Sequence, residues 1–101
     1  MNIRESARRI AAALTFNGFG DQPNRQVLAL AEEVGEFVGA FRRWSGQARR
    51  SDTEEHVVEE LADVVITAYV TAAEYNWDLD DAIERKLEII FSRGWREAEV
   101  R

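Results

Sequence analysis

The stretch Glu32-Glu33-Val34-Gly35-Glu36 places two adjacent carboxylates ahead of two small or apolar residues and a third carboxylate. The same pattern returns 27 positions later as Glu59-Glu60-Leu61-Ala62-Asp63. Residues three or four apart share one face of a helix, so each stretch, if helical, directs its carboxylates to one side. Two such helices packed together would aim several carboxylates at one point.

Hydrophobic residues around both stretches recur with the spacing of helices, whereas strand signals are weak. We predict four helices, over roughly residues 2–16, 24–44, 52–76 and 78–94. Short polar loops join them, so the prediction is an all-α fold, an antiparallel four-helix bundle that forms one domain over residues 1–101. The two central helices carry the apolar stripes Val27, Leu30, Ala31, Val34, Phe37, Val38 and Phe41, and Val57, Leu61, Val64, Val65, Ala68 and Ala72.

Polar residues and glycines mark the expected helix ends. A capping box should start the third helix, formed by Asp52 with Glu55 or by Ser51 with Glu54. Asp78 should cap the fourth helix, and Gly94 should end it.

Composition narrows the function classes. A net charge of −6 without a basic run argues against nucleic acid as a partner. The absence of cysteine excludes disulfides, thiolate metal sites and cysteine nucleophiles. No apolar stretch approaches the length of a membrane-spanning helix, and the first residues lack the apolar segment of a signal peptide. We therefore expect a cytoplasmic protein with no membrane contact, and its small core favours assembly into oligomers.

The carboxylates border the apolar stripes. At 100° per residue, Glu33 lies next to its stripe and Glu36 one step outside, and Glu60 and Asp63 repeat this geometry. If the two stripes pack together, all four carboxylates gather along one edge of the interface. A solvated acidic face usually has Lys or Arg four residues on. The residues found there are instead Phe37, Ala40, Val64 and Thr67.

Carboxylates without basic partners beside a core indicate a bound cation. An all-oxygen ligand set favours Mg²⁺, with Mn²⁺ as a substitute, while the lack of cysteine and the single histidine argue against zinc. That histidine, His56, lies four residues before Glu60, either on the helix surface or at the edge of the site. Mg²⁺ commonly binds together with substrate phosphates, so the pattern suggests hydrolysis of a phosphate ester or anhydride.

The ordered set of motifs resembles the all-α nucleoside triphosphate pyrophosphohydrolases, the superfamily of MazG and the dCTP pyrophosphatases. The resemblance extends over roughly residues 15–95. It rests on Gln22-Pro23, Leu28-Ala29-Leu30-Ala31-Glu32-Glu33-Val34-Gly35-Glu36, the segment from Phe41 to Trp44, Glu59-Glu60-Leu61-Ala62-Asp63-Val64, and Asp78-Leu79 with Ala82 and Lys86.

This resemblance implies a MazG-like enzyme that hydrolyses a nucleoside triphosphate, NTP or dNTP, to the monophosphate and pyrophosphate, as in house-cleaning of nucleotide pools. It implies a homodimer, or a homotetramer built from two dimers. Glu32 would orient or deprotonate the attacking water, or support a metal ligand. Lys86 and Arg93 would bind the phosphates, unless Lys86 pairs with an acid on another helix. Trp44 would stack on the base or simply pack at its helix end. The implied Mg²⁺ ligands are Glu33, Glu36, Glu60 and Asp63.

Two positions depart from the family pattern. Ile90 replaces an asparagine that often follows the lysine, and Asp21 replaces a histidine often found before Gln22-Pro23. Nucleotide recognition therefore differs from that of the dCTP enzymes. Two other functions stay open: a non-catalytic helical assembly or regulatory module, and a phosphohydrolase acting on another phosphoribosyl substrate. Gly35 and Gly39 suggest close helix contacts, either between subunits or within one chain.

Overall fold

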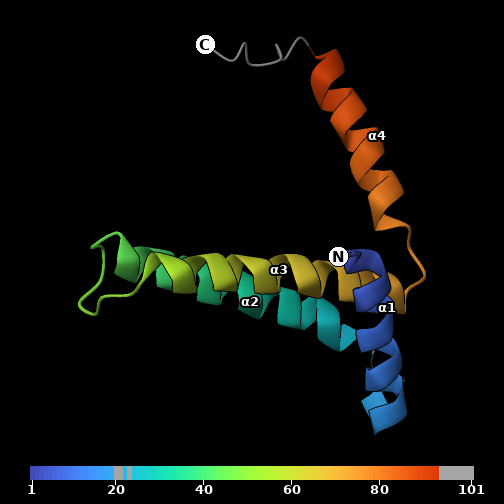
Figure 1. Ribbon diagram of the computed structural model, residues 1–101, viewed down its shortest axis with the longest axis horizontal. Coiled ribbons are helices and arrows are strands. Elements are labelled where there is room, and N and C mark those ends of the chain that lie inside the picture. Colours follow the sequence, from blue (N-terminus) through green and yellow to red (C-terminus); the bar gives the residue numbers. More distant parts are fainter. Residues whose placement is uncertain (20–21, 23, 94–101) are drawn as a thin grey trace.

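The computed structural model describes residues 1–19, 22 and 24–93, and these contain helices and no strand (Figure 1). The all-α prediction is thus confirmed. The predicted end of the last helix at Gly94 lies outside the described residues. The elements are α1 (Ile3–Leu14), a π-helical turn η1 (Thr15–Phe19), α2 (Asn24–Trp44), α3 (Glu54–Glu74) and α4 (Leu79–Ser92).

The two long helices end in the same backbone motif. After α2, Gly46 takes a left-handed conformation (φ 83°), and the N–H of Gln47 donates to the carbonyl of Arg42 at 2.8 Å. After α3, Asn76 takes that conformation (φ 56°), and the N–H of Trp77 donates to the carbonyl of Ala72 at 2.8 Å. Glycine and asparagine tolerate the left-handed region best, so these two residues stop the helices at these points.

The start of α3 differs from both predicted capping boxes. Thr53 is the N-cap, and its side chain accepts a hydrogen bond from the N–H of His56 at 3.1 Å. Asp52 is not the cap because its carboxylate is engaged by the N–H of Thr53, by Arg43 and by His56. The predicted cap of α4 is confirmed, since Asp78 accepts from the N–H of Asp81 at 3.0 Å.

The helices α2 and α3 lie antiparallel along most of their length, and α1 packs across the second half of α3 (Figure 1). The side chains that this packing buries are small, and none of the large side chains among the described residues is fully buried. The buried apolar residues are Ala7, Ala40, Val57, Val70 and Ala72. Small residues allow the helix axes to approach closely, but they bury little apolar area.

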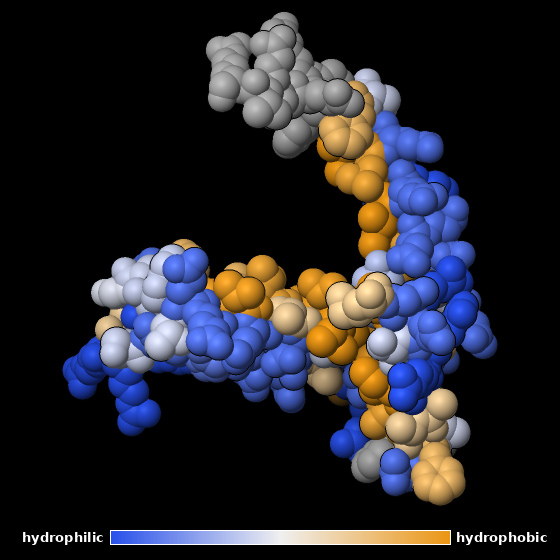
Figure 2. Space-filling view, viewed as in Figure 1, coloured by the Kyte–Doolittle hydropathy of each residue, from blue (hydrophilic) through white to orange (hydrophobic). Residues whose placement is uncertain are grey.

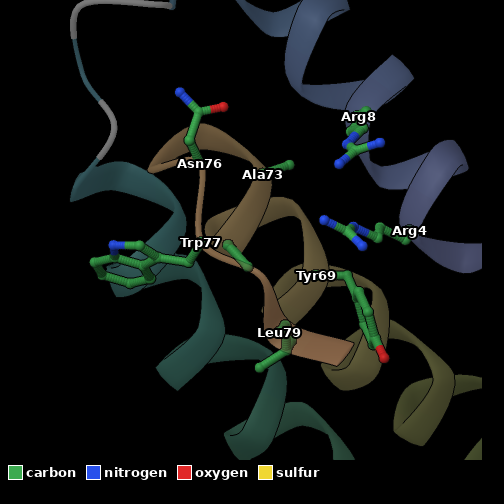
Figure 3. A pocket seen from close by; sticks show the side chains of 8 residues that line it. Arg4, Arg8, Tyr69, Ala73, Asn76, Trp77 and Leu79 are labelled. Atoms are coloured by element: carbon green, nitrogen blue, oxygen red, sulfur yellow. The ribbon is translucent and has the colours of Figure 1, made fainter. Parts of the chain in front are cut away.

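The helix α4 projects away from the other three (Figure 1). Among the described residues its beginning is anchored: Arg4 lies 3.4 Å from the carboxylate of Asp78, and the hydroxyl of Tyr69 donates to Asp80 at 2.6 Å. In this joint Arg4 and Arg8 of α1 point toward Tyr69, beside a small cavity also lined by Trp77 and Leu79 (Figure 3). The radius of gyration is 16.8 Å, against about 13 Å for a compact chain of this length.

The apolar stripes of α2 and α3 do not pack on each other as expected. Val34, Val38 and Phe41 on α2 are 42%, 45% and 41% exposed, and Leu61 and Val65 on α3 are similarly open. On α2 the contact face carries the buried Ala40, roughly a quarter turn from the stripe, and on α3 it lies at the edge of the stripe, where Val57 is buried. Figure 2 shows the apolar residues along one side of the α2–α3 pair and along the inner side of α4, both facing the same open angle.

Within the described residues, no helix has the length and apolar character needed to cross a bilayer.

Candidate metal centre

Three of the predicted metal ligands meet where α2 lies against α3. Glu33 and Glu36 come from successive turns of α2, and Glu60 comes from α3. One carboxylate oxygen from each of the three lies within 4.8 Å of the others. The carboxylates therefore converge from two helices. Glu33 and Glu60 are half-buried in the helix contact, whereas Glu36 is exposed.

Two oxygens of this cluster are buried without a partner. Oε2 of Glu33 and Oε2 of Glu60 have no hydrogen-bond donor among the described residues. Leaving a buried carboxylate oxygen unpaired costs about 1–3 kcal/mol, and more when the group is charged. The donor set is entirely carboxylate oxygen, which is the chemistry that Mg²⁺ and Mn²⁺ prefer. The residues present therefore fit a divalent cation of this class.

The charges in the cluster oppose one another. Burial raises the pKa of Glu33 above its ordinary value, and the neighbouring carboxylates of Glu36, Asp63 and Glu60 raise it further. Asp63 thus lies near enough to act on Glu33, although it is exposed and stands outside the group of three. A cation bound between these acids would reverse the effect, since a positive charge favours the ionised form.

A chain of hydrogen bonds leads from the cluster to the end of the α2–α3 hairpin. His56 Nε2 lies 2.9 Å from Oε1 of Glu60, and His56 Nδ1 lies 2.8 Å from Oδ1 of Asp52. Arg43 Nε and Nη2 each lie 3.0 Å from Oδ2 of Asp52. His56 therefore touches the edge of the cluster, which was one of its two predicted placements.

These contacts shift two pKa values in opposite directions. The hydrogen bond to Asp52 is the main cause that raises the pKa of His56, and Glu60 adds to it. The N–H of Thr53, followed by the hydrogen bonds to His56 and Arg43, lowers the pKa of Asp52. Sequence reasoning did not predict a role at the site for Arg43 or for Asp52, which was predicted as a helix cap. The signal was nevertheless present, because Asp52, His56 and Glu60 follow one another at four-residue spacing.

The other predicted site residues lie outside the cluster. Glu32 is exposed on α2. Trp44 is 44% exposed and packs edge-on against Phe41, with ring centroids 6.0 Å apart. Lys86 lies on α4 and Arg93 is the C-cap of that helix, which points away from the acids of its own chain (Figure 1). Within the part of the chain that the structure describes, Lys86 has no acidic partner, so the predicted alternative of an ion pair with another helix is not seen.

A second group of cations lies near the end of the hairpin and was not predicted. Arg42 and Arg43 at the end of α2, together with Arg49 and Arg50 in the following loop, line a shallow cavity of about 250 Å³. Gly39 forms part of its wall, one turn beyond Glu36 along α2. The wall of this cavity at Gly39 therefore lies one helical turn from Glu36.

The comparisons with known proteins fit this site. A model of the MazG-like family matches residues 29–95, which include both acidic stretches and α4. A comparison with curated proteins and a comparison with solved structures gave no match. The family match extends over well more than half of the 101 residues, and it includes each predicted metal ligand. The chain therefore belongs to the MazG-like family.

Proposed function

We propose that this protein is a Mg²⁺-dependent nucleoside triphosphate pyrophosphohydrolase that releases pyrophosphate and a nucleoside monophosphate. The observation that carries the proposal is the meeting of three carboxylates from two helices, two of which have a buried oxygen without a donor. Membership of the MazG-like family supports the same reading. An exposed acidic face on a scaffold protein has no need to bury such oxygens.

In this proposal Glu33, Glu36, Glu60 and Asp63 hold the cation, and Mn²⁺ substitutes for Mg²⁺. A bound divalent ion supplies charge neutralisation at the phosphate oxygens and lowers the pKa of a coordinated water. Glu32, exposed one residue before Glu33, would orient the attacking water or accept its proton. The water attacks the α-phosphorus and the bond to the bridging oxygen of the pyrophosphate breaks.

A second copy of the chain completes the molecule in this proposal. The inner side of α4 exposes Ile83, Leu87 and Phe91 by 40–53%, and the stripes on the α2–α3 pair are exposed as well. Gly35 lies among the α2 stripe residues, and an added Cβ there would meet nothing within 4 Å. Another backbone could therefore approach closely at this point. A two-fold dimer would cover each α4 with the open side of the partner's hairpin, and two dimers could pair further into a tetramer.

The dimer also explains how cations reach the acids. Lys86 and Arg93 are two turns apart on the same side of α4, beside its apolar stripe. When a partner's α4 lies along the hairpin, these two side chains approach the cluster of the other chain. There they stabilise charge on the leaving pyrophosphate. Trp44, exposed at the end of α2, is available to stack on the base.

The metal site is tested by turnover. Glu36→Gln and Asp63→Asn should each reduce pyrophosphate release from a panel of NTPs and dNTPs to the background rate, with helical circular dichroism unchanged. Glu59→Gln is the matched control, since Glu59 is an exposed acid of the same motif and should leave turnover intact. Full activity in both site variants would refute the assignment. If the unaltered protein releases no pyrophosphate from any nucleotide, the alternative of a non-catalytic helical module gains ground.

The shared site is tested by mixing two inactive variants. Unfolded and refolded together, Glu36→Gln and Lys86→Ala chains form mixed dimers in which one of two sites combines unaltered acids with an unaltered partner lysine. About a quarter of all sites should then be intact, because random pairing makes half of the dimers mixed. Recovery of activity toward that level supports the crossed arrangement. No recovery, with dimers present, means that each chain uses its own α4 or the arginines near the hairpin end.

A further inference from the structure

We propose that His56 is a positioning residue that holds the carboxylate of Glu60 in the orientation needed to bind the cation, with Asp52 and Arg43 holding His56 in turn. The inference deepens the proposed function and rests on the metal site described there. It assigns to the hairpin end a role in the chemistry of the acid cluster.

The first step is the division of labour between the two oxygens of Glu60. Oε1 accepts a hydrogen bond from His56 Nε2 at 2.9 Å, whereas Oε2 is buried and has no donor among the described residues. The side chain of Glu60 is only 16% exposed, so water does not readily replace His56. One oxygen is thereby fixed by the imidazole and the other is left to bind a cation.

The second step is the support of the imidazole on its far side. His56 Nδ1 lies 2.8 Å and 2.9 Å from the two oxygens of Asp52, whose side chain is 13% exposed. The guanidinium of Arg43 holds Asp52 through two nitrogens, each at 3.0 Å, and it reaches across from the end of α2. Because both ring nitrogens are engaged, the imidazole cannot turn without breaking a contact. Ligand carboxylates and imidazoles at metal sites are commonly oriented in this way.

The series of contacts through Arg43, Asp52, His56 and Glu60 differs from an ordinary ion pair on a helix surface. Asp81 and Arg85 also lie four residues apart, but their side chains are 57% and 69% exposed. The contacts from Arg43 through Asp52 and His56 to Glu60 instead join α2 to α3. The last of these contacts is made to a carboxylate oxygen of the acid cluster. A pair like Asp81–Arg85 contributes a few tenths of a kcal/mol and orients nothing else.

The test uses two variants that each keep one half of the imidazole contacts. The side-chain amide of Gln can reach the place of Nε2, so His56→Gln retains a donor toward Glu60. The amide of Asn reaches only the place of Nδ1, so His56→Asn keeps the contact with Asp52 and loses Glu60. Both are neutral and of similar helix propensity to histidine or better. Mn²⁺ serves as the probe, titrated into the full-length protein and followed by electron paramagnetic resonance of the free ion.

The expected result is a Mn²⁺ dissociation constant that rises about 10–100-fold in His56→Asn and much less in His56→Gln. The exposed pair on α4 supplies the control, since Asp81→Asn should leave Mn²⁺ binding unchanged. Saturating Mn²⁺ should restore most of kcat in His56→Asn, because the variant impairs loading of the site and removes no ligand. Thermal unfolding of the metal-free variants shows whether the fold is intact.

Three outcomes overturn the inference. If both variants bind Mn²⁺ as the unaltered protein does, His56 does not position Glu60, and the proposed metal site stands. If His56→Gln and His56→Asn lose affinity equally, in step with their loss of metal-free thermal stability, the contacts only clamp the hairpin. If the unaltered protein binds no Mn²⁺, the metal site and its positioning residue fail together.

Discussion

The α2–α3 pair and α4 carry apolar stripes of the same helical spacing, yet the chain treats them differently. The pair is held together by a face of small residues and acids, with Ala40 and Val57 buried beside Glu33 and Glu60. The helix α4 is held, within the part of the chain that the structure describes, at its start through Asp78 and Asp80. In both regions the most apolar face is left open (Figure 2). The most hydrophobic face of each region is thus not the face that packs within the chain. An exposed apolar face of this kind is typical of a surface that binds another protein molecule.

The largest effect is expected when the exposed apolar stripe of α4 is disrupted. Leu87→Glu places a charge in the middle of the exposed stripe of α4, where Leu87 is 45% exposed in the single chain. Losing the burial of one leucine costs about 1.5–3 kcal/mol, and burying the charge costs more. We therefore expect the dissociation constant of the proposed dimer to rise at least about a hundredfold. Sedimentation equilibrium measures this constant.

The control for Leu87→Glu is Arg85→Glu on the outer side of the same helix. It introduces the same side chain and removes only an exposed ion pair, so its effect should be small. Equal dissociation in both variants, or a monomer in the unaltered protein, would show that the stripe of α4 is not an interface.

An intermediate effect is expected when Mg²⁺ binds the acid cluster between α2 and α3. Mg²⁺ at a hundred times its dissociation constant should stabilise the protein by about 2.7 kcal/mol. For a domain of this size that is a rise in Tm of roughly 10 °C or more. Glu60→Gln should abolish the rise, whereas Glu59→Gln should keep it. Hydrogen exchange should show the added protection in α2 and α3 around the cluster. A shift that survives in Glu60→Gln would place the ion elsewhere.

The smallest effect concerns Glu74, a half-buried acid of α3 outside the cluster. Its Oε2 has no partner among the described residues, and burial raises its pKa above the ordinary value. A raised pKa in the folded state means that stability is greatest at low pH and falls as pH rises through that pKa. Glu74→Gln should therefore raise Tm by a few degrees near pH 7 and have almost no effect near pH 4, below the ordinary pKa of glutamate. The exposed Glu84→Gln is the control, and a gain that is equal at both pH values would contradict the explanation.

Much of the fold could be predicted from sequence because helical spacing and helix ends are local signals. The limits of α2, the cap at Asp78 and the approach of Glu33, Glu36 and Glu60 all follow from residues a few positions apart. The site was harder to predict from sequence where it depends on tertiary contacts. Asp52 looked like a cap, but Arg43 from the neighbouring helix and His56 engage its carboxylate instead. The orientation of the stripes was missed for the same reason, since periodicity identifies an apolar face but not which surface covers it.

The projecting last helix has a consequence for how the protein matures. In the proposed dimer, α4 packs on the partner chain, so the last step of folding would be the association of two molecules. Recovery from denaturant should accordingly accelerate as protein is added, and a very dilute sample should stall at a loosely ordered stage. The direction of α4 is set at its start, where Tyr69 and Arg4 contact Asp80 and Asp78. These contacts would then determine whether two associating chains pack correctly.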